Sequence, residues 1–127
     1  MAKAAKEITF ATGNRVGVLD KVAQALQKAR VNIQHICAWS EGSKAHFALV
    51  TNSNARARKA LSKLGIRSGE KDVLLLSLQN KVGSLGRVAR RLAKANVNIS
   101  CITATTAGKR ASVLLTTSNN RKARRVV

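Results

Sequence analysis

The stretch Asn14-Arg15-Val16-Gly17-Val18-Leu19 returns in the second half of the chain as Asn80-Lys81-Val82-Gly83-Ser84-Leu85. Each copy follows a short apolar run and opens an amphipathic segment that ends on Val-Asn-Ile, at residues 31–33 and 97–99. Placed on each other from these asparagines, residues 14–61 and 80–127 align without a gap and share 21 identities in 48 pairs. Chance would produce only a few identities, so the chain contains one structural unit twice.

The composition indicates two small, aliphatic and strongly basic domains. A chain of 127 residues fits one ordinary domain or two very small ones, and the repeat decides for two. Apolar residues make up 45% of the chain and aromatic residues 2%, so the cores must be built from Leu, Val, Ile and Ala. The formal charge of +19 favours partners such as nucleic acid, an anionic surface or an acidic protein.

Both copies show the same order of predicted elements, read from apolar periodicity and turn residues. The first copy predicts strand 7–12, helix 19–29, strands 31–40 and 45–51, helix 55–63 and a short strand 66–67. The second predicts strand 72–78, helix 85–95, strands 97–106 and 111–117, and a last helix from about residue 119. Each copy is therefore βαββα, with a fourth strand available to the first alone. This order predicts a ferredoxin-like α+β fold, with helices on one face of a sheet.

These motifs resemble the ACT domain. The resemblance rests on Asn-x-x-Gly-x-Leu at residues 14–19 and 80–85, each followed by an aliphatic helix, Val-Asn-Ile and a second strand. ACT domains are regulatory βαββαβ modules that bind amino acids and control metabolic enzymes. The resemblance implies two such units side by side, at residues 7–69 and 71–127, the second lacking its last strand. It therefore implies an amino-acid-binding regulatory protein with no attached enzyme.

The resemblance also implies where a ligand would bind. ACT domains commonly pair through their second strands, and ligands lie at that seam, between the loop after the first strand and the start of the partner's second strand. The residues implied here are Thr12, Asn14, Val16, Gly17, Val18, Leu19, Asn32, Ile33, Asn80, Val82, Gly83, Ser84, Leu85, Asn98 and Ile99. Glycine leaves room for a carboxylate at the unpaired N–H groups of a helix N-terminus. Asparagine amides can meet both an ammonium and a carboxylate.

A structural interpretation of the same residues stands beside this one. The asparagines of the two loops can cap the helices that follow, and the glycines can permit tight packing of helix on strand. Asn32 and Asn98 can shape the turn into the second strand. The copies also differ, because Thr12 of the first is replaced by Leu78 in the second. If one site alone is functional, the sequence favours the one built on Thr12 and Asn14.

The second copy is shorter than the first at its C-terminal end. Residues equivalent to 62–69 do not follow Val127, so the sequence predicts no fourth strand to pair with strand 72–78. That would leave Val73–Leu78 as an apolar sheet edge, and such edges recruit another chain. The sequence leaves three outcomes open: a homodimer, a swapped strand, or a chain shorter than its natural relatives.

Other classes of function fit the residues less well. His35 and Cys37 share a strand face, but no acidic residue is placed to orient the histidine, so no catalytic residues are assigned. Two cysteines and two histidines lack zinc-ligand spacing, so no metal and no cofactor are expected. Nucleic-acid binding is the alternative, since RNA-binding modules share the ferredoxin-like fold. Those modules stack bases on sheet aromatics, and this chain has only Phe10, Trp39 and Phe47.

The resemblance to ACT domains implies three partners: a free amino acid as ligand, a second copy of the chain and a target enzyme. No apolar run in the chain is long enough to span a membrane as a helix, and the N-terminus has no signal-peptide pattern. No membrane is therefore expected, and the expected location is cytoplasmic.

Overall fold

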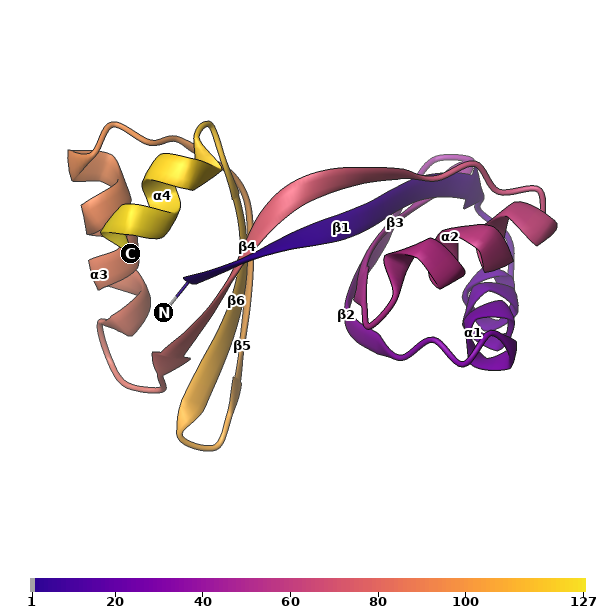
Figure 1. Cartoon of the computed structure of the whole chain (residues 1–127), viewed down its shortest axis with the longest axis horizontal. Coiled ribbons are helices and arrows are strands. Elements are labelled where there is room, and N and C mark those ends of the chain that lie inside the picture. The colour runs from indigo at the N-terminus through magenta and orange to yellow at the C-terminus, as the bar shows by residue number, and fades with distance from the viewer. Residues whose placement is uncertain (1) are drawn as a thin grey trace. The chain divides into compact units, whose positions relative to one another are not determined.

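The computed structural model describes residues 2–127, which form six strands and four helices (Figure 1). In chain order they are β1 (Ala2–Gly13), α1 (Val18–Lys28), β2 (Ile33–Glu41), β3 (Lys44–Thr51), α2 (Asn54–Lys63), β4 (Gly69–Gln79), α3 (Ser84–Lys94), β5 (Ile99–Ala107), β6 (Arg110–Thr117) and α4 (Asn120–Val126). They build two compact units. The first unit is residues 6–71, and the second unit is residues 72–127 together with the described residues 2–5. Strands β1 and β4 each contribute to both.

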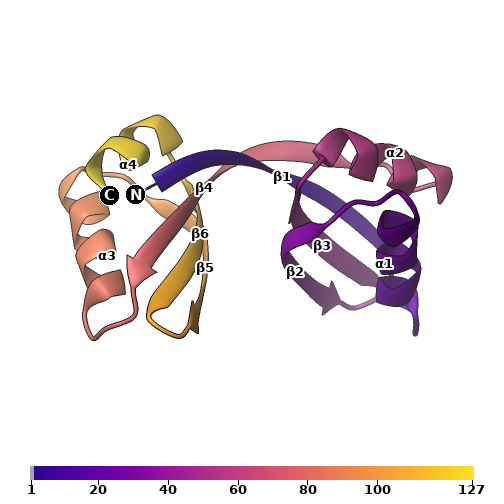
Figure 2. The same cartoon turned by 60° about the horizontal axis from the view of Figure 1, so that its bottom comes forward.

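The first unit is a four-stranded sheet with strand order β2-β3-β1-β4 and both of its helices on one face (Figure 2). Residues of β1 and β3 alternate so that Ile8 and Leu49 face the helices and lie opposite each other in the antiparallel register. They pack against Leu26 of α1 and Leu61 of α2, and all four side chains are fully buried. The helices form where their apolar residues recur at helical spacing, because that spacing gives each helix one face to bury.

The second unit repeats this arrangement with strand order β1-β4-β6-β5. Leu74 of β4 lies opposite Leu115 of β6, and both pack against Leu92 of α3 and Ala123 of α4. Each of these core positions is the aligned counterpart of one in the first unit, as Leu92 is of Leu26. The predicted α+β class with two ferredoxin-like units is therefore confirmed. The short strand predicted at 66–67 is wrong, since the fourth strand of the first unit begins at Gly69.

The exposed edge predicted at Val73–Leu78 is also wrong. No strand follows α4 in the described chain, yet the place beside β4 is taken by the start of β1, which begins at Ala2 rather than at Glu7. Ala2 packs against the core of the second unit, and Val73 and Leu74 are each 1% exposed. The second unit is thus completed by the N-terminal end of the same chain, and this strand requires no second molecule.

The second strands of the two units are edge strands. Within the described residues, β2 is hydrogen-bonded to β3 alone and β5 to β6 alone. The expectation that these two strands pair with each other is therefore wrong for a single chain. Each keeps one row of backbone N–H and C=O groups without a strand partner, which is a template for pairing with another molecule.

Candidate functional site

The two asparagine loops are tied to the hairpin turn of their own unit. The Asn14 backbone N–H donates to the Ser43 carbonyl oxygen at 2.8 Å, and its side-chain Nδ2 donates to the Gly42 carbonyl oxygen at 3.2 Å. Asn80 makes the same pair of bonds to Lys109 and Gly108, at 2.9 and 2.8 Å. The asparagine side chains therefore anchor the loop and do not cap the helix.

The helix caps are instead Gly17 and Gly83, each with a φ of +87°. A Cβ built on Gly17 meets no atom within 4 Å, so glycine is needed for its backbone conformation and not for close packing. The residue before each glycine points into solvent: Val16 and Val82 are fully exposed. Leu19 and Leu85, on the first turn of each helix, are half-exposed, so each loop presents apolar side chains beside a helix N-terminus.

Replacing Gly83 with alanine is expected to lower the unfolding free energy by about 1–2 kcal/mol, the cost of holding a Cβ in the left-handed region. Gly86→Ala is the control in the helix that follows. Gly86 lies inside α3 with open space around an added Cβ, so alanine there is expected to stabilise by about 0.5–1 kcal/mol. Urea denaturation measures both. Equal effects of the two substitutions would show that the turn does not impose its backbone conformation.

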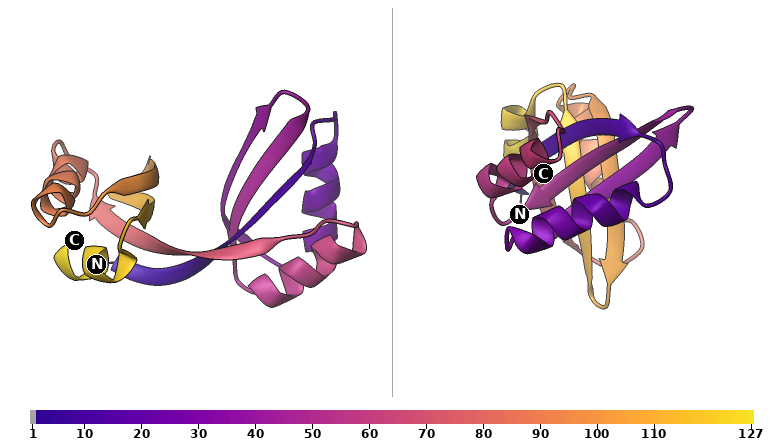
Figure 3. Two further views of the ribbon diagram at one scale, coloured as in Figure 1. Left: turned by 90° about the horizontal axis from the view of Figure 1, so that it is seen from above. Right: turned by 90° about the vertical axis from the view of Figure 1, so that its right-hand side faces the viewer.

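The predicted residues Asn32 and Asn98 lie at the starts of the second strands, β2 and β5. Asn32 precedes β2 and exchanges hydrogen bonds with Asn52, which follows β3, at 2.9 and 3.1 Å. Asn98 does the same with Ser118, at 3.0 and 2.8 Å. The loops at Asn14 and Asn80 lie instead at the hairpin-turn ends of the same strands (Figure 3). One unit therefore does not bring its own asparagines together.

Several of the predicted ligand-binding residues face inward and pack against the cores. Val18, Ile33 and Ile99 pack at the margins of the two cores. Ser84 is 9% exposed, and its Oγ accepts a hydrogen bond from Arg87 Nη2 at 3.4 Å. The Thr12 hydroxyl donates to the Gly13 carbonyl oxygen at 3.1 Å. The groups left pointing outward are the loop valines, the two leucines and the backbone at the helix starts.

One hollow lies near the C-terminal end of a second strand, and another lies at the start of a second strand. One, of about 180 Å³, is in the second unit between the loop at Asn80 and the C-terminal half of β5. The other, of about 420 Å³, is in the first unit between the last turns of α1 and the start of β2, and Asn32 lines it. Small-molecule sites usually measure about 300–1,000 Å³. The hollow at Asn80 is smaller than that, so this loop builds part of a site.

Sequence reasoning missed the strand residues that line the hollow at Asn80. Ala104, Thr105 and Thr106 of β5 form its wall opposite Ser84 and Leu85. Their signal was present in the sequence, because the strand after Val-Asn-Ile was predicted to be the seam-forming strand. The Val-Asn-Ile motif marks the start of that strand, and no motif marks its C-terminal end.

The described residues hold no group of three or more His, Cys, Asp or Glu side chains placed to bind a metal ion. Trp39 of β2 stacks on His46 of β3, with ring centroids 5.3 Å apart, and its indole N–H donates to Glu41 Oε1 at 3.2 Å. This aromatic pair is peculiar to the first unit, since Thr105 and Ser112 hold the equivalent places. None of the described helices has the length and apolar character needed to cross a membrane.

Comparison with known proteins agrees with this architecture. Residues 4–127 match the family of ACT domain pairs. Protein BT0572 from Bacteroides thetaiotaomicron has a similar structure, with a TM-score of 0.92, 25% identity, and coverage of 98% of this chain and 87% of that one. The regulatory subunit of aspartate kinase from Thermus thermophilus, in a ligand-free form, has a TM-score of 0.69 at 17% identity, covering 99% and 95%.

The regulatory subunit of aspartate kinase from Thermus flavus is similar as well, with a TM-score of 0.66, 19% identity, and coverage of 99% and 92%. No curated protein matches the chain. The family match spans both repeats, and the two βαββαβ units have the strand order and helix placement derived above. The chain therefore belongs to the family of ACT domain pairs.

Proposed function

We propose that this ACT domain pair is a non-catalytic regulatory protein that binds a free amino acid between two copies of the chain. The observation that carries the proposal is the separation of each unit's loop from its own Val-Asn-Ile segment by the length of an edge strand. Antiparallel pairing of two edge strands puts the end of one beside the start of the other. A loop at Asn14 or Asn80 would then meet Asn32 or Asn98 of the partner copy.

The open edges have the apolar surface that such pairing would cover. Ile36 of β2 and Ile102 of β5 are equivalent positions of the repeat and are 40% and 38% exposed. Each lies on the helix-facing side of its edge strand, opposite the buried Leu49 or Leu115. The exposed valines and leucines of the two asparagine loops add apolar surface. Equivalent positions in both units are therefore apolar where a second copy would pack.

At the proposed site, the N–H groups of the second and third residues of α1 or α3 would bind the ligand carboxylate, since no side chain caps either helix. The N–H groups of the first residues, Val18 and Ser84, already donate to the Arg15 and Lys81 carbonyl oxygens at 3.2 Å. Asn32 or Asn98 of the other copy would bind the ammonium through its amide oxygen. The half-exposed leucines favour a small or apolar ligand side chain. Occupancy would stabilise the seam, and a target enzyme or another copy would respond to that change.

The test is a thermal-shift panel of the twenty amino acids at low and high salt, with oligonucleotides as the competing ligand class. One amino acid is expected to raise the melting temperature at both salt concentrations, because binding to the folded state alone stabilises it. A response to oligonucleotides alone, lost at high salt, would contradict the proposal and favour nucleic-acid binding through the basic helices.

Substitution at the edges tests the shared site. The double variant Ile36→Asp, Ile102→Asp is expected to convert a dimer into a monomer in light scattering and to abolish the amino-acid response, since buried carboxylates would face each other across the seam. Leu64→Asp is the matched control, because Leu64 is 46% exposed at the end of α2 and belongs to neither edge strand. A double variant that remains dimeric and responsive would exclude the seam as the site.

A further inference from the structure

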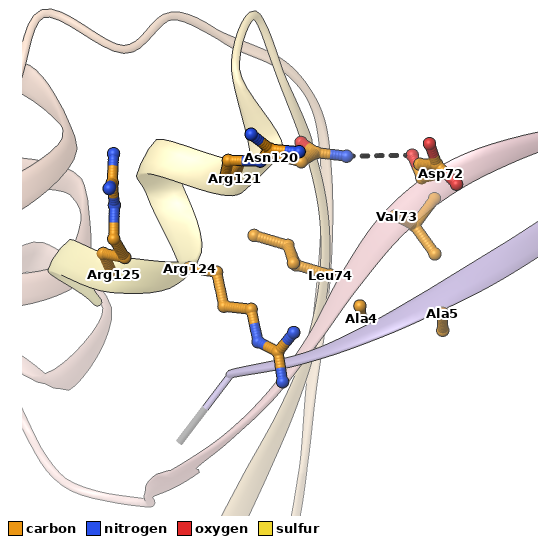
Figure 4. A pocket seen from close by; sticks show the side chains of 9 residues that line it. All are labelled: Ala4, Ala5, Asp72, Val73, Leu74, Asn120, Arg121, Arg124 and Arg125. Atoms are coloured by element: carbon orange, nitrogen blue, oxygen red, sulfur yellow. Dashed lines mark hydrogen bonds between the residues drawn. The ribbon is translucent and has the colours of Figure 1, made fainter.

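A cavity of about 620 Å³ lies within the second unit, between α4 and the strands β1 and β4 (Figure 4). Its floor is apolar, formed by Ala4, Val73 and Leu74. Its wall is the basic face of α4, from which Arg121 and Arg124 line the space. Figure 4 shows the Arg124 side chain reaching down from α4 toward the start of β1. None of the residues that line this cavity belongs to either asparagine loop.

The internal repeat shows what the equivalent residues do in the first unit. Arg58 and Asn54 are the aligned counterparts of Arg124 and Asn120. There, Arg58 Nη1 lies 3.3 Å from Glu70 Oε1, and Asn54 Nδ2 donates to Glu70 Oε2 at 3.1 Å. The same arginine also donates to the Ser68 carbonyl oxygen at 2.8 Å. One carboxylate thus bridges the arginine and the asparagine, and its side chain is 29% exposed.

The second unit keeps the framework of this arrangement. Asn120 Oδ1 accepts from the Thr117 hydroxyl at 2.7 Å, as Asn54 Oδ1 does from Thr51. Asn120 Nδ2 donates to the Asp72 carbonyl oxygen at 3.0 Å, as Asn54 Nδ2 does to the Lys6 carbonyl oxygen. The amide is therefore held in the orientation that meets a carboxylate in the first unit.

The carboxylate itself is missing from the second unit. In the first unit, two contacts between β1 and β4 indicate how these strands are aligned. Lys71 Nζ lies 3.4 Å from Glu7 Oε1, and a Cβ built on Gly69 would lie 3.8 Å from Thr9 Oγ1, which puts Glu70 opposite Ile8. Continued along the same two strands, this register puts Ala4 opposite Leu74, the counterpart of Ile8. Ala4 thus holds the place of Glu70, and Arg124 has no hydrogen bond or ion pair with any described residue. The only acidic side chain lining the cavity in the described chain is Asp72.

We propose that this cavity binds a small organic anion through its carboxylate, whose oxygens bind Arg124 and Asn120 as those of Glu70 bind Arg58 and Asn54 in the first unit. The guanidinium fork matches an oxyanion, and charged hydrogen bonds of this kind are strong. The apolar part of the ligand packs on the floor of the cavity. The volume is that of small-molecule sites, and the charge of +19 concentrates anions near the surface.

The test is an NMR titration of the full chain at physiological salt, following backbone amides and arginine Nε–H groups. The probes are hexanoate, inorganic phosphate and neutral hexanamide. We expect hexanoate to shift Ala4, Leu74 and Arg124 in a saturable way, and hexanamide to leave them unmoved. Tighter binding of hexanoate than of phosphate identifies an organic anion. Equal or tighter binding of phosphate, or shifts spread evenly over the basic helices, would overturn the proposal.

Matched variants separate this site from general attraction between charges. Arg124→Gln is expected to weaken hexanoate binding at least tenfold, while Arg58→Gln removes the same charge and leaves it unchanged. Ala4→Glu supplies an internal carboxylate like Glu70 and is expected to abolish binding and raise the melting temperature. Equal losses in the two arginine variants would contradict the site. The amino-acid proposal is unaffected by either result, because its residues lie elsewhere.

Discussion

A chain that lacks residues 2–5 is expected to lose about 3 kcal/mol or more of unfolding free energy in the second unit, because each lost ladder hydrogen bond contributes about 1 kcal/mol. These residues form the strand beside β4, and Ala2 packs against the core. Val73 and Leu74, now 1% exposed, would gain solvent contact, and burial of such a side chain is worth about 1.5–3 kcal/mol. This is a large part of the total stability of a small domain.

Hydrogen exchange measured residue by residue checks this prediction. The deletion is expected to accelerate exchange of β4 amides near Leu74 and Leu76, while the first-unit amides near Leu49 stay protected. Lys3→Thr is the control, because it keeps the strand, substitutes a better strand former and leaves the edge covered. The bared edge is also expected to promote association of the deleted chain. Unchanged protection of β4 in the deleted chain would show that residues 2–5 do not complete the sheet.

Leu26→Ala and Leu92→Ala are each expected to cost about 2–5 kcal/mol, the usual range for removing a fully buried leucine side chain. Both leucines are 0% exposed, occupy equivalent positions on α1 and α3, and pack against the equivalent strand residues Leu49 and Leu115. The core of the second unit is aliphatic throughout, while that of the first also holds the stacked rings of Phe10 and Phe47, so it is not built from aliphatic residues alone as the composition predicted. Shortening a leucine is expected to leave a cavity in either core, because the surrounding side chains relax only in part.

Urea denaturation of each variant measures the loss of unfolding free energy, and hydrogen exchange shows which of the two units loses stability. We expect each substitution to destabilise its own unit more than the other, because the two cores are separate clusters. Leu26→Met and Leu92→Met are the controls and should cost less than about 1.5 kcal/mol, since they conserve volume. If one alanine variant lowered protection equally in both units, the units would have to unfold as one.

Much of the fold was predictable from local pattern. The helices at 18–28 and 84–94 lie within one residue of the predicted ranges, because the apolar spacing of each specifies the buried face. Ser53 caps α2 by accepting from the Arg56 N–H at 3.4 Å, which is a common role of serine at the start of a helix. The site was predictable in part. The loops and Val-Asn-Ile segments stand out as repeated motifs, but their separation along an edge strand depends on strand pairing.

The sequence alone determined the repeat, the helical faces and the position of both asparagine loops, because these follow from periodicity and turn chemistry over short stretches of chain. It indicated the ACT class through the resemblance of its two repeated motifs to that family. The tertiary structure decided which segment completes the second sheet. Ala2-Lys3-Ala4-Ala5 has weak strand propensity, and it becomes a strand because the backbone of β4, in the other half of the chain, offers hydrogen bonds and a buried face. The same nonlocal pairing puts an alanine where the first unit has Glu70, and so leaves Arg124 without a carboxylate.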